Sequence, residues 1–315
     1  MSKKIIAVIG ATGQQGGGLV RAICADPASG FTARALTRDP NSAKAKELAA
    51  LGAEVVEADI DDAASIRAAF NGAHGAFCVT FFWNHFSAEK EIAEVHTMAD
   101  AAKGAGLQHV VWSTLEDTRK FVPLSSDQMP TLHGKYKVPH FDGKGESDHL
   151  FTDAGVPTTF LLTSFYYDNF IFFGLGPKKG PDGVLAITFP MADKPLPMIS
   201  ADDIGRCAFG IFKQGKAHIG KRVGIAGDHL PCGQIAAAFT RHLGKEVRYN
   251  YVPPEVYRTF GFPGADDLGN MFQFKRDFNE QFCTARSIEF SRSINPRLQS
   301  FDQWLGENIK RIPME

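Results

Sequence analysis

The sequence lacks the signals of a disulfide-bonded, metal-binding or membrane-spanning protein. Its five cysteines are scattered and none forms a C-x-x-C pair, so we expect reduced thiols and no metal site. No apolar run approaches the ~20 residues needed to cross a bilayer. A strand pattern starts where a signal peptide would carry its charged and apolar regions. We therefore expect a cytoplasmic protein that makes no membrane contact.

The chain also lacks a strong charge of either sign. Its net charge is -1, with 22% charged and 44% hydrophobic residues over 315 positions. A near-neutral chain has no overall basic field for general nucleic-acid or acidic-membrane binding, so we expect neither as a partner. There is no internal repeat and no low-complexity tract. The length allows one or two ordinary globular domains.

What the sequence does contain is an apolar strand that leads into a glycine-rich turn. Residues 5–9 are all aliphatic, which is typical of a strand buried on both faces of a parallel sheet. Gly10, Gly13 and Gly16 follow in the spacing G-x-x-G-x-x-G. They allow a sharp turn, close approach of a pyrophosphate to the backbone, and tight packing of the next helix. Because a helix N-terminus then faces the anion, the stretch predicts a dinucleotide-phosphate cradle.

The second predicted strand, 31–36, ends at the place where a dinucleotide fold meets the adenosine ribose. A carboxylate there accepts hydrogen bonds from the 2′-hydroxyl of NAD, whereas an arginine suits the 2′-phosphate of NADP. Arg38 stands at this place and favours NADP(H). Two alternatives remain open: Asp39 turns toward a hydroxyl, or Arg38 is an ordinary solvated turn residue.

The third predicted strand, 53–57, is followed by Asp59 and Ile60. By fold position, Asp59 would accept a hydrogen bond from the adenine amine and Ile60 would cover the ring. The alternative is that the acids of this stretch only cap the next helix, a role that Asp61 or Asp62 fills equally well.

The fourth predicted strand, 75–80, ends at the sheet edge where ligands bind in such folds. Thr80, Phe81 and Phe82 lie at this end. Aromatic residues here either line the path of the cofactor or plug the core, and the sequence does not separate the two interpretations.

A fifth predicted strand, 109–114, precedes a polar, proline-interrupted segment at 115–138 without periodicity. We interpret this segment as a mobile flap, since long loops without internal structure are often lids. A helix at 140–152 then carries Lys144. The sixth strand, 155–162, returns to the same edge with an aromatic stretch that includes Phe165, Tyr166, Tyr167 and Asn169.

Six strands alternating with helices predict an α/β fold, a Rossmann-type doubly wound parallel sheet with right-handed crossovers. From about residue 170 the predicted elements become shorter and the loops richer in glycine and proline. We therefore divide the chain into an NAD(P)-binding domain at 1–169 and a smaller C-terminal α/β lobe at 170–315. This lobe would pack on the first domain and contact a substrate or partner.

Together these motifs resemble the NmrA-like family of atypical short-chain dehydrogenases/reductases, most of all its NADPH-sensing members. The resemblance spans the whole chain and rests on the G-A-T-G-x-x-G turn, Val79-Thr80, and the blocks F-D-G-K-G-E at 141–146 and G-F-P-G-A-D-D-L-G-N-M-F at 261–272. It implies NADP(H) as the cofactor. The residues that it implies as cofactor contacts are Gly10, Thr12, Gly13, Gln14, Gln15, Gly16, Arg38, Thr80, Phe81, Phe82, Lys144, Tyr166, Tyr167 and Asn169.

Ordinary short-chain dehydrogenases carry Tyr-x-x-x-Lys, in which the lysine lowers the pKa of the tyrosine so that its phenol exchanges a proton with the substrate. The tyrosine position before Lys144 holds His140 here, and Tyr136 lies four residues earlier. His140 is either a structural residue or a proton shuttle. Lys144 itself resembles the acid–base lysine of the isoflavone-reductase relatives. Lys144 and His140 are thus the catalytic candidates.

Two functions stay open. The missing tyrosine favours a sensor or regulator of the NADPH/NADP+ state that acts through cofactor-dependent conformation and a protein partner. The alternative is an NADPH-dependent reductase of a quinone or other conjugated carbonyl, with Lys144 or His140 as the proton donor. Three kinds of partner stay open: a protein partner, a small quinone or carbonyl substrate, and a second copy of the chain in a homodimer.

Overall fold

The computed structural model describes residues 3–314 and divides the chain into two compact units. The first unit comprises Met1–Asp117, His140–Leu162 and Ala201–Val223, and the second comprises Thr118–Pro139, Thr163–Ser200 and Gly224–Glu315. The predicted division had one boundary at residue 169, whereas the chain passes repeatedly between the units. Residues 201–223 belong with the first unit because of contacts far apart in the sequence, which local patterns do not reveal.

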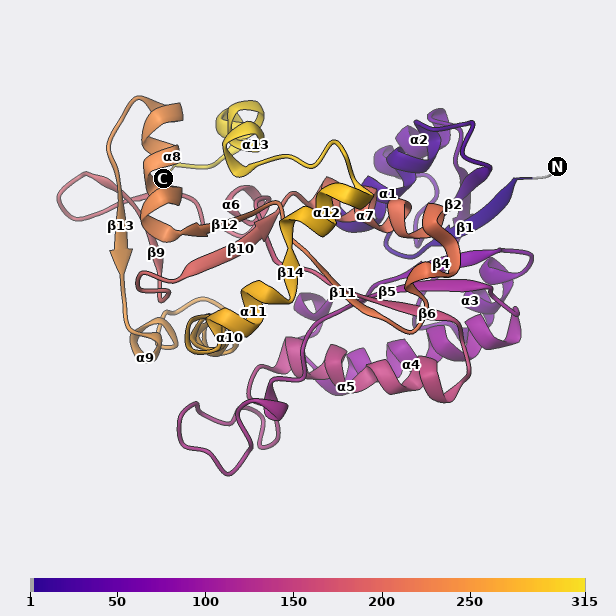
Figure 1. The fold of residues 1–315 in the computed structure, drawn as a ribbon, viewed down its shortest axis with the longest axis horizontal. Helices are drawn as coiled ribbons and strands as arrows, with labels where there is room; N and C mark the ends of the chain where they lie inside the picture. The colour runs from indigo at the N-terminus through magenta and orange to yellow at the C-terminus, as the bar shows by residue number, and fades with distance from the viewer. Residues whose placement is uncertain (1–2, 315) are drawn as a thin grey trace. The chain divides into compact units, whose positions relative to one another are not determined.

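The first unit is built on a parallel sheet with the strand order β3-β2-β1-β4-β5-β6. Its strands are β1 (Lys4–Val8), β2 (Phe31–Thr37), β3 (Glu54–Glu57), β4 (Gly75–Cys78), β5 (His109–Thr114) and β6 (Thr158–Leu162). The strand order reverses between β1 and β4 (Figure 1). Ligands of such sheets bind outside the carboxyl ends of the strands at this reversal. The predicted doubly wound fold is confirmed.

The sheet continues past β6 with β11 (Arg222–Ile225), which runs from the first unit into the second. In the second unit, Gly224 and Ile225 pair in parallel with β14 (Arg286–Ser287).

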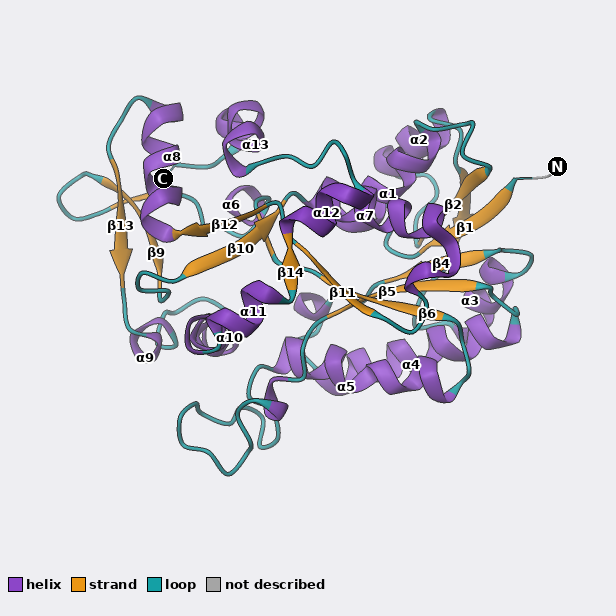
Figure 2. Ribbon diagram, in the orientation of Figure 1, coloured by secondary structure: helices purple, strands orange, loops and turns teal. Residues whose placement is uncertain are grey.

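Helices cover both faces of the sheet in the first unit (Figure 2). On one face lie α3 (Ala63–Phe70), α4 (Ala88–Gly104) and α5 (Pro139–Asp153). They contribute Ile66, Met98 and Phe151 to one apolar cluster with the strands. The other face carries α1 (Gln14–Cys24), α2 (Ala43–Ala50) and α7 (Ala201–Gln214).

Helices α1 and α7 pack backbone against backbone. A Cβ atom added at Gly205 would lie 2.1 Å from the Leu19 nitrogen, and one at Gly18 would lie 2.8 Å from the Asp202 Cα atom. Both positions therefore require glycine. Arg21 forms an ion pair with Asp202 beside this contact. The packing explains why α7, expected in the C-terminal lobe, belongs to the first unit.

The second unit contains two small sheets, with the strand orders β12-β10-β7 and β13-β9-β8. Their strands are β7 (Phe165–Tyr166), β8 (Lys178–Lys179), β9 (Leu185–Phe189), β10 (Pro195–Ile199), β12 (Asp228–Pro231) and β13 (Val247–Tyr251). The helices are α6 (Asn169–Phe172), α8 (Cys232–Leu243), α9 (Pro254–Tyr257), α10 (Ala265–Asp277), α11 (Asn279–Thr284), α12 (Ile288–Ile294) and α13 (Phe301–Asn308). The core is rich in aromatic rings, among them those of Phe165, Phe170, Phe189 and Phe272.

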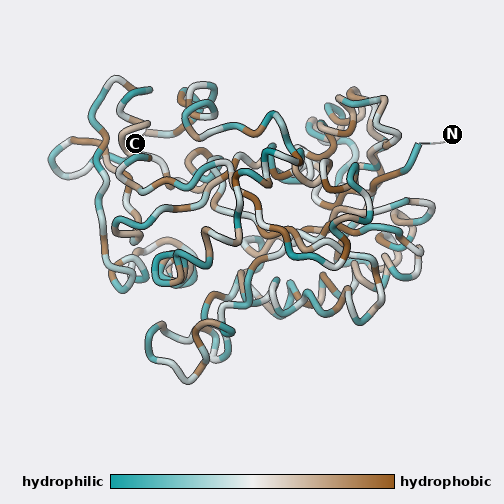
Figure 3. The backbone as a smooth tube through the Cα atoms, in the orientation of Figure 1, coloured by the Kyte–Doolittle hydropathy of each residue, from teal (hydrophilic) through white to brown (hydrophobic). Residues whose placement is uncertain are grey.

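Within the described residues, no helix is both long and apolar enough to cross a membrane. Figure 3 shows hydrophobic and polar residues interspersed along the helices.

The segment expected to be an unstructured flap is fastened to α10 within the second unit. The Asn270 side-chain amide donates to the carbonyls of Pro130 at 3.0 Å and Lys137 at 2.6 Å, and that of Gln273 donates to the Gln128 carbonyl at 2.7 Å. Arg258 Nη1 donates to the side-chain oxygens of both Asn270 and Gln273, which fixes the direction of the two amides.

The segment is also held together from within. Lys137 is buried, and its ammonium group donates to the carbonyls of Ser126 at 2.8 Å and Met129 at 2.7 Å. The expectation that this segment has no internal structure is therefore wrong. Its contacts are irregular and its anchors lie more than a hundred residues away in the sequence, so periodicity gives no sign of them.

Replacing Asn270 tests this anchor. Asn270→Ala leaves two carbonyls without their amide donor, so we expect the free energy of unfolding to fall by about 1–3 kcal/mol. Proteolysis should also cut residues 118–139 faster. The exposed Gln281→Ala in the next helix is the matched control in denaturant unfolding. An unchanged stability and cleavage rate would contradict the anchoring role.

Candidate functional site

The glycine-rich turn lies between the end of β1 and the start of α1. Gly10 has φ +63°, a left-handed conformation that favours glycine, and the Gly13 nitrogen donates to the Gly10 carbonyl at 2.9 Å. A Cβ atom at Gly16 would lie only 2.4 Å from that carbonyl oxygen. The helix can start this close to the strand only because residue 16 is glycine.

The N-terminus of α1 faces the carboxyl edge of the sheet without a side-chain cap. Its N-cap is Gly13, which makes no side-chain hydrogen bond, and Gly13 and the adjacent Gln14 are exposed. Thr12 is half-buried. Uncapped backbone N–H groups and the helix dipole together form an anion site. The geometry therefore fits the predicted phosphate cradle.

Gln15 ties this cradle to β5. The Ser113 hydroxyl donates to Gln15 Oε1 at 2.8 Å, across the edge of the sheet. A hydroxyl at the end of β5 is thus used to hold α1 in place.

The two charged residues in the loop after β2, Arg38 and Asp39, differ in their contacts. Arg38 is exposed, and no ion pair to it is found among residues 3–314. Asp39 Oδ1 accepts from the Asn41 nitrogen at 2.9 Å, so this carboxylate shapes its own loop. A contact of Arg38 or of Asp39 with a ribose substituent stays a prediction.

The acidic residues after β3 also differ in the groups that they bind. Asp62 Oδ1 accepts from the Ala64 nitrogen at 2.9 Å and is the cap of α3. Asp59 Oδ1 accepts from the Asp61 nitrogen, and Ile60 packs against the apolar core. Capping is therefore done by Asp62, and an adenine contact by Asp59 and Ile60 stays a prediction.

The two phenylalanines after β4 differ in burial, and a cofactor contact by either stays a prediction. Phe82 is buried and lies against the rings of Trp83, His85 and Phe86, so it plugs the core. Phe81 is 59% exposed at the same edge and remains available to a ligand.

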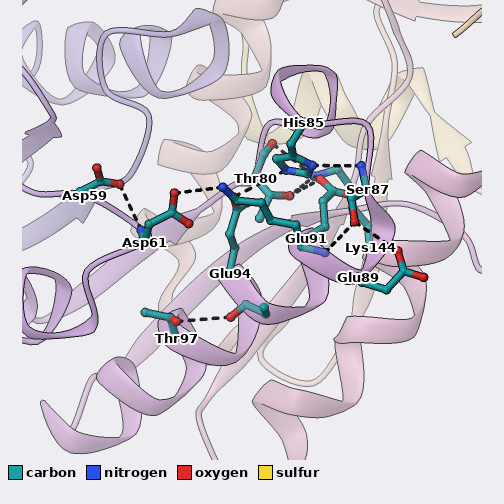
Figure 4. A network of polar contacts seen from close by, with 12 residues as sticks. Asp59, Asp61, Thr80, His85, Ser87, Glu89, Glu91, Glu94, Thr97 and Lys144 are labelled. Atoms are coloured by element: carbon teal, nitrogen blue, oxygen red, sulfur yellow. Dashed lines mark hydrogen bonds and ion pairs between the residues drawn. The ribbon is translucent and has the colours of Figure 1, made fainter.

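Lys144 is the centre of a buried polar cluster in the first unit (Figure 4). Its Nζ atom lies 3.0 Å from Glu91 Oε1 and donates to the Thr80 carbonyl at 3.3 Å. The Thr80 hydroxyl accepts from Lys144 and donates to the same Glu91 oxygen at 2.6 Å. The ammonium group also lies 5.3 Å from the Trp112 ring centroid. Lys144 is therefore held as a cation in a fixed direction.

Two glycines bring Lys144 to this place. A Cβ atom at Gly143 would lie 3.0 Å from the Ala88 Cβ atom, and one at Gly145 would lie 2.3 Å from the Asp117 nitrogen. The glycines on either side of Lys144 thus let α5 lie against α4 and against the chain after β5. This contact is the physical reason for the G-K-G sequence.

Glu91 is a site residue that sequence reasoning missed. It is fully buried, and its Oε2 atom has no hydrogen-bond partner among the described residues. The buried positions of α4 include 88, 91, 94, 95 and 98, so Glu91 and Glu94 lie on the apolar face of the helix. The sequence did contain one signal for these residues, because two acids occur on the otherwise apolar face of the predicted helix.

Glu94 lies one turn beyond Glu91, with Oε1 3.5 Å from His85 Nε2. Burial, and then the charges of Glu91 and Asp61, raise the pKa of Glu94 to about 7. Burial also lowers the pKa of His85, whose Nδ1 accepts from the Ser87 nitrogen at 3.1 Å. Near neutral pH, this corner of the cluster holds a carboxyl group that exchanges its proton.

His140 packs among aromatic rings. Its ring centroid lies 4.8 Å from that of Trp83, 5.8 Å from that of Phe82 and 4.8 Å from that of Phe141. These contacts give the histidine a structural role. A catalytic role for His140 stays a prediction.

The last predicted cofactor contacts, Phe165 to Asn169, lie in the second unit. Phe165 belongs to its aromatic core, and Tyr167 is fully buried against Phe301 and Trp304. Tyr166 and Asn169 are half-buried. The rings of Phe165 and Tyr167 thus serve packing, and cofactor binding by this stretch stays a prediction.

A doubly wound sheet with a glycine turn at the reversal of its strand order defines a Rossmann-type protein. A sequence model of the NmrA-like family matches residues 2–305. The chain belongs to the NmrA-like family.

Two relatives show the range of this family. The NmrA-like family domain-containing oxidoreductase FrzB of Cladobotryum sp. is 31% identical over 293 residues, which cover 86% of this chain and 83% of the relative. The nitrogen metabolite repression protein nmrA of Emericella nidulans is 31% identical over 262 residues, which cover 80% and 69%.

A solved structure agrees in fold. The crystal structure of Nmra, a negative transcriptional regulator, in complex with NADP has a TM-score of 0.79 at 26% identity, covering 99% of this chain and 97% of that chain. The same regulator has been solved with NAD.

Replacing Glu94 tests its buried charge. The ionised carboxylate costs stability, and this cost is small near pH 4.5 and complete once the pH has risen through about 7. Glu94→Gln should therefore raise the free energy of unfolding at pH 8 by up to about 3 kcal/mol, and hardly change it at pH 4.5. Denaturant unfolding at the two pH values measures this. Glu89→Gln, which removes an exposed acid of the same helix, is the control. An effect of equal size at both pH values would contradict the assignment.

Proposed function

We propose that the chain binds NADP(H) and acts as a redox sensor or regulator through cofactor-dependent conformation and a protein partner. One observation carries this proposal. Lys144 is engaged in a buried ion pair with Glu91, while the position one helical turn earlier holds His140 packed among aromatic rings. Among residues 3–314, no tyrosine hydroxyl contacts Lys144, so the lysine lacks the phenol that is the usual proton donor of a dehydrogenase.

The cradle fits the cofactor. Side chains at Gly10, Gly13 and Gly16 would crowd the turn, and the uncapped N-terminus of α1 suits a pyrophosphate. Arg38 would bind the 2′-phosphate, and Lys144 would donate to the nicotinamide ribose. The related regulator solved with NADP and with NAD supports this choice.

The regulatory part of the proposal is supported by similarity to a negative transcriptional regulator and to a nitrogen metabolite repression protein. We infer a protein partner in the cytoplasm. Because residues 118–139 are bonded to α10, any cofactor-dependent change there would involve the segment and the helix together.

A second candidate is an NADPH-dependent reductase of a quinone or conjugated carbonyl, favoured by relatives named oxidoreductases such as FrzB. NADPH supplies a hydride in such reactions. In this chain the proton would come from Lys144, which forms an ion pair with Glu91, or from His140.

A turnover assay separates the two functions. The protein is incubated with NADPH and a panel of quinones and carbonyls, and the absorbance of the reduced nicotinamide is followed. The sensor proposal predicts binding without multiple turnover. Sustained oxidation that Lys144→Met abolishes would establish the reductase instead.

Replacing Arg38 tests the choice of cofactor. Arg38→Ala should weaken NADPH binding by about 1.5–3 kcal/mol, since a charge-assisted bond to the 2′-phosphate is lost, and should hardly change NADH binding. Calorimetric titration of both cofactors measures this, with Lys46→Ala as an exposed-cation control in the next helix. Equal weakening of both cofactors would overturn the role of Arg38.

A further inference from the structure

The buried cluster around Lys144 contains two carboxyl groups, those of Glu91 and Glu94, but only one ammonium group. Glu91 and Glu94 lie three residues apart on α4, where side chains are neighbours on one face. Glu91 is paired with Lys144 at 3.0 Å. Glu94 is only 7% exposed, and its Oε1 atom lies 3.5 Å from Nε2 of His85, whose pKa is lowered by burial. With both acids ionised, this buried cluster carries a net charge of minus one.

The other charged groups that face Glu94 do not remove this excess. Lys90, on the same helix, pairs at the surface with Asp61 at 3.0 Å, so their charges largely cancel. Lys144, from α5, is engaged by Glu91 and Thr80. A proton on Glu94 neutralises the cluster, and losing that proton restores the negative charge.

We propose that Glu94 regulates the cofactor site by taking up a proton when NADPH binds at Lys144, and less of one when NADP+ binds. This inference rests on the proposed function. The phosphates of bound NADPH would add negative charge to the first unit, while Lys144 keeps its ion pair with Glu91, so the potential at Glu94 becomes more negative. The proton on Glu94 is then held more tightly.

The oxidised nicotinamide ring carries a positive charge that the reduced ring lacks. That charge offsets part of the negative potential, so the uptake of a proton is smaller with NADP+. Glu94 thereby converts the redox state of the cofactor into a protonation state inside α4. Glu94 touches no reacting atom and acts through Glu91 and Lys144, so it is a positioning residue.

The sign of the pH dependence follows from this uptake. Because binding takes up a proton, the affinity for NADPH rises as the pH falls through the range in which Glu94 titrates. With its pKa at about 7, Glu94 is half protonated in the free protein at pH 7, so the uptake there reaches at most about half a proton. An uptake of that size changes the affinity about threefold per pH unit.

Calorimetry measures the uptake directly. NADPH and NADP+ are titrated into the full chain at pH 7 in two buffers of different ionisation enthalpy, and the difference in heat gives the number of protons taken up. The wild type should take up more protons with NADPH than with NADP+. Glu94→Gln should lose this difference, and Glu89→Gln, which removes an exposed acid of the same helix, should keep it. Protonation of the 2′-phosphate contributes equally to every variant.

The outcomes distinguish the two proposals. No heat of binding in either buffer overturns the proposed function. Binding whose proton uptake is the same in the wild type and Glu94→Gln, or the same for both cofactor forms, overturns the inference while leaving cofactor binding intact.

Infrared spectroscopy of the cofactor-free wild type provides a measurement that needs no variant to fold. A protonated-carboxyl band should disappear on raising the pH through about 7, and NADPH should shift that change to higher pH. If every carboxyl group is already ionised at pH 6, Glu94 holds no proton and the inference fails.

Discussion

The structure of the site depends on the close approach of α1 to β1, which a side chain at residue 16 would prevent. A Cβ atom there would lie 2.4 Å from the Gly10 carbonyl oxygen. The same helix meets α7 through Gly18 and Gly205, so its axis is fixed from two sides. The uncapped N-terminus is thereby held at the reversal of strand order, where a phosphate can meet backbone N–H groups.

The second element of the site is the charge held at Lys144. An ammonium group in a buried cluster needs a partner, and Glu91 with Thr80 supplies it. In a dehydrogenase the lysine would also act on a neighbouring phenol. Here the corresponding position is His140, held by Trp83 and Phe82, and the excess acid in the cluster is Glu94. The charge balance of this cluster, rather than a phenol, links the lysine to its surroundings.

Sequence patterns predicted most of the fold because periodicity and glycine spacing report on local structure. The six strands, the turn at Gly10 and the helix of Lys144 all follow from them. Glu91 and Glu94 were missed because acids on a helix usually face solvent, and their partners come from other elements. The anchoring of residues 118–139 by Asn270 was not predicted either, because its partners also come from a distant part of the chain. A hydrogen bond from a side-chain amide to a distant carbonyl does not produce a periodic sequence pattern.

The central claim is that the chain responds differently to the two redox forms of one cofactor. Hydrogen exchange across the chain, measured at saturation with NADPH and again at saturation with NADP+, tests it most directly. The account predicts different protection in α4 and α5, which carry Glu91, Glu94 and Lys144. Identical protection throughout the chain with both forms would contradict a redox sensor.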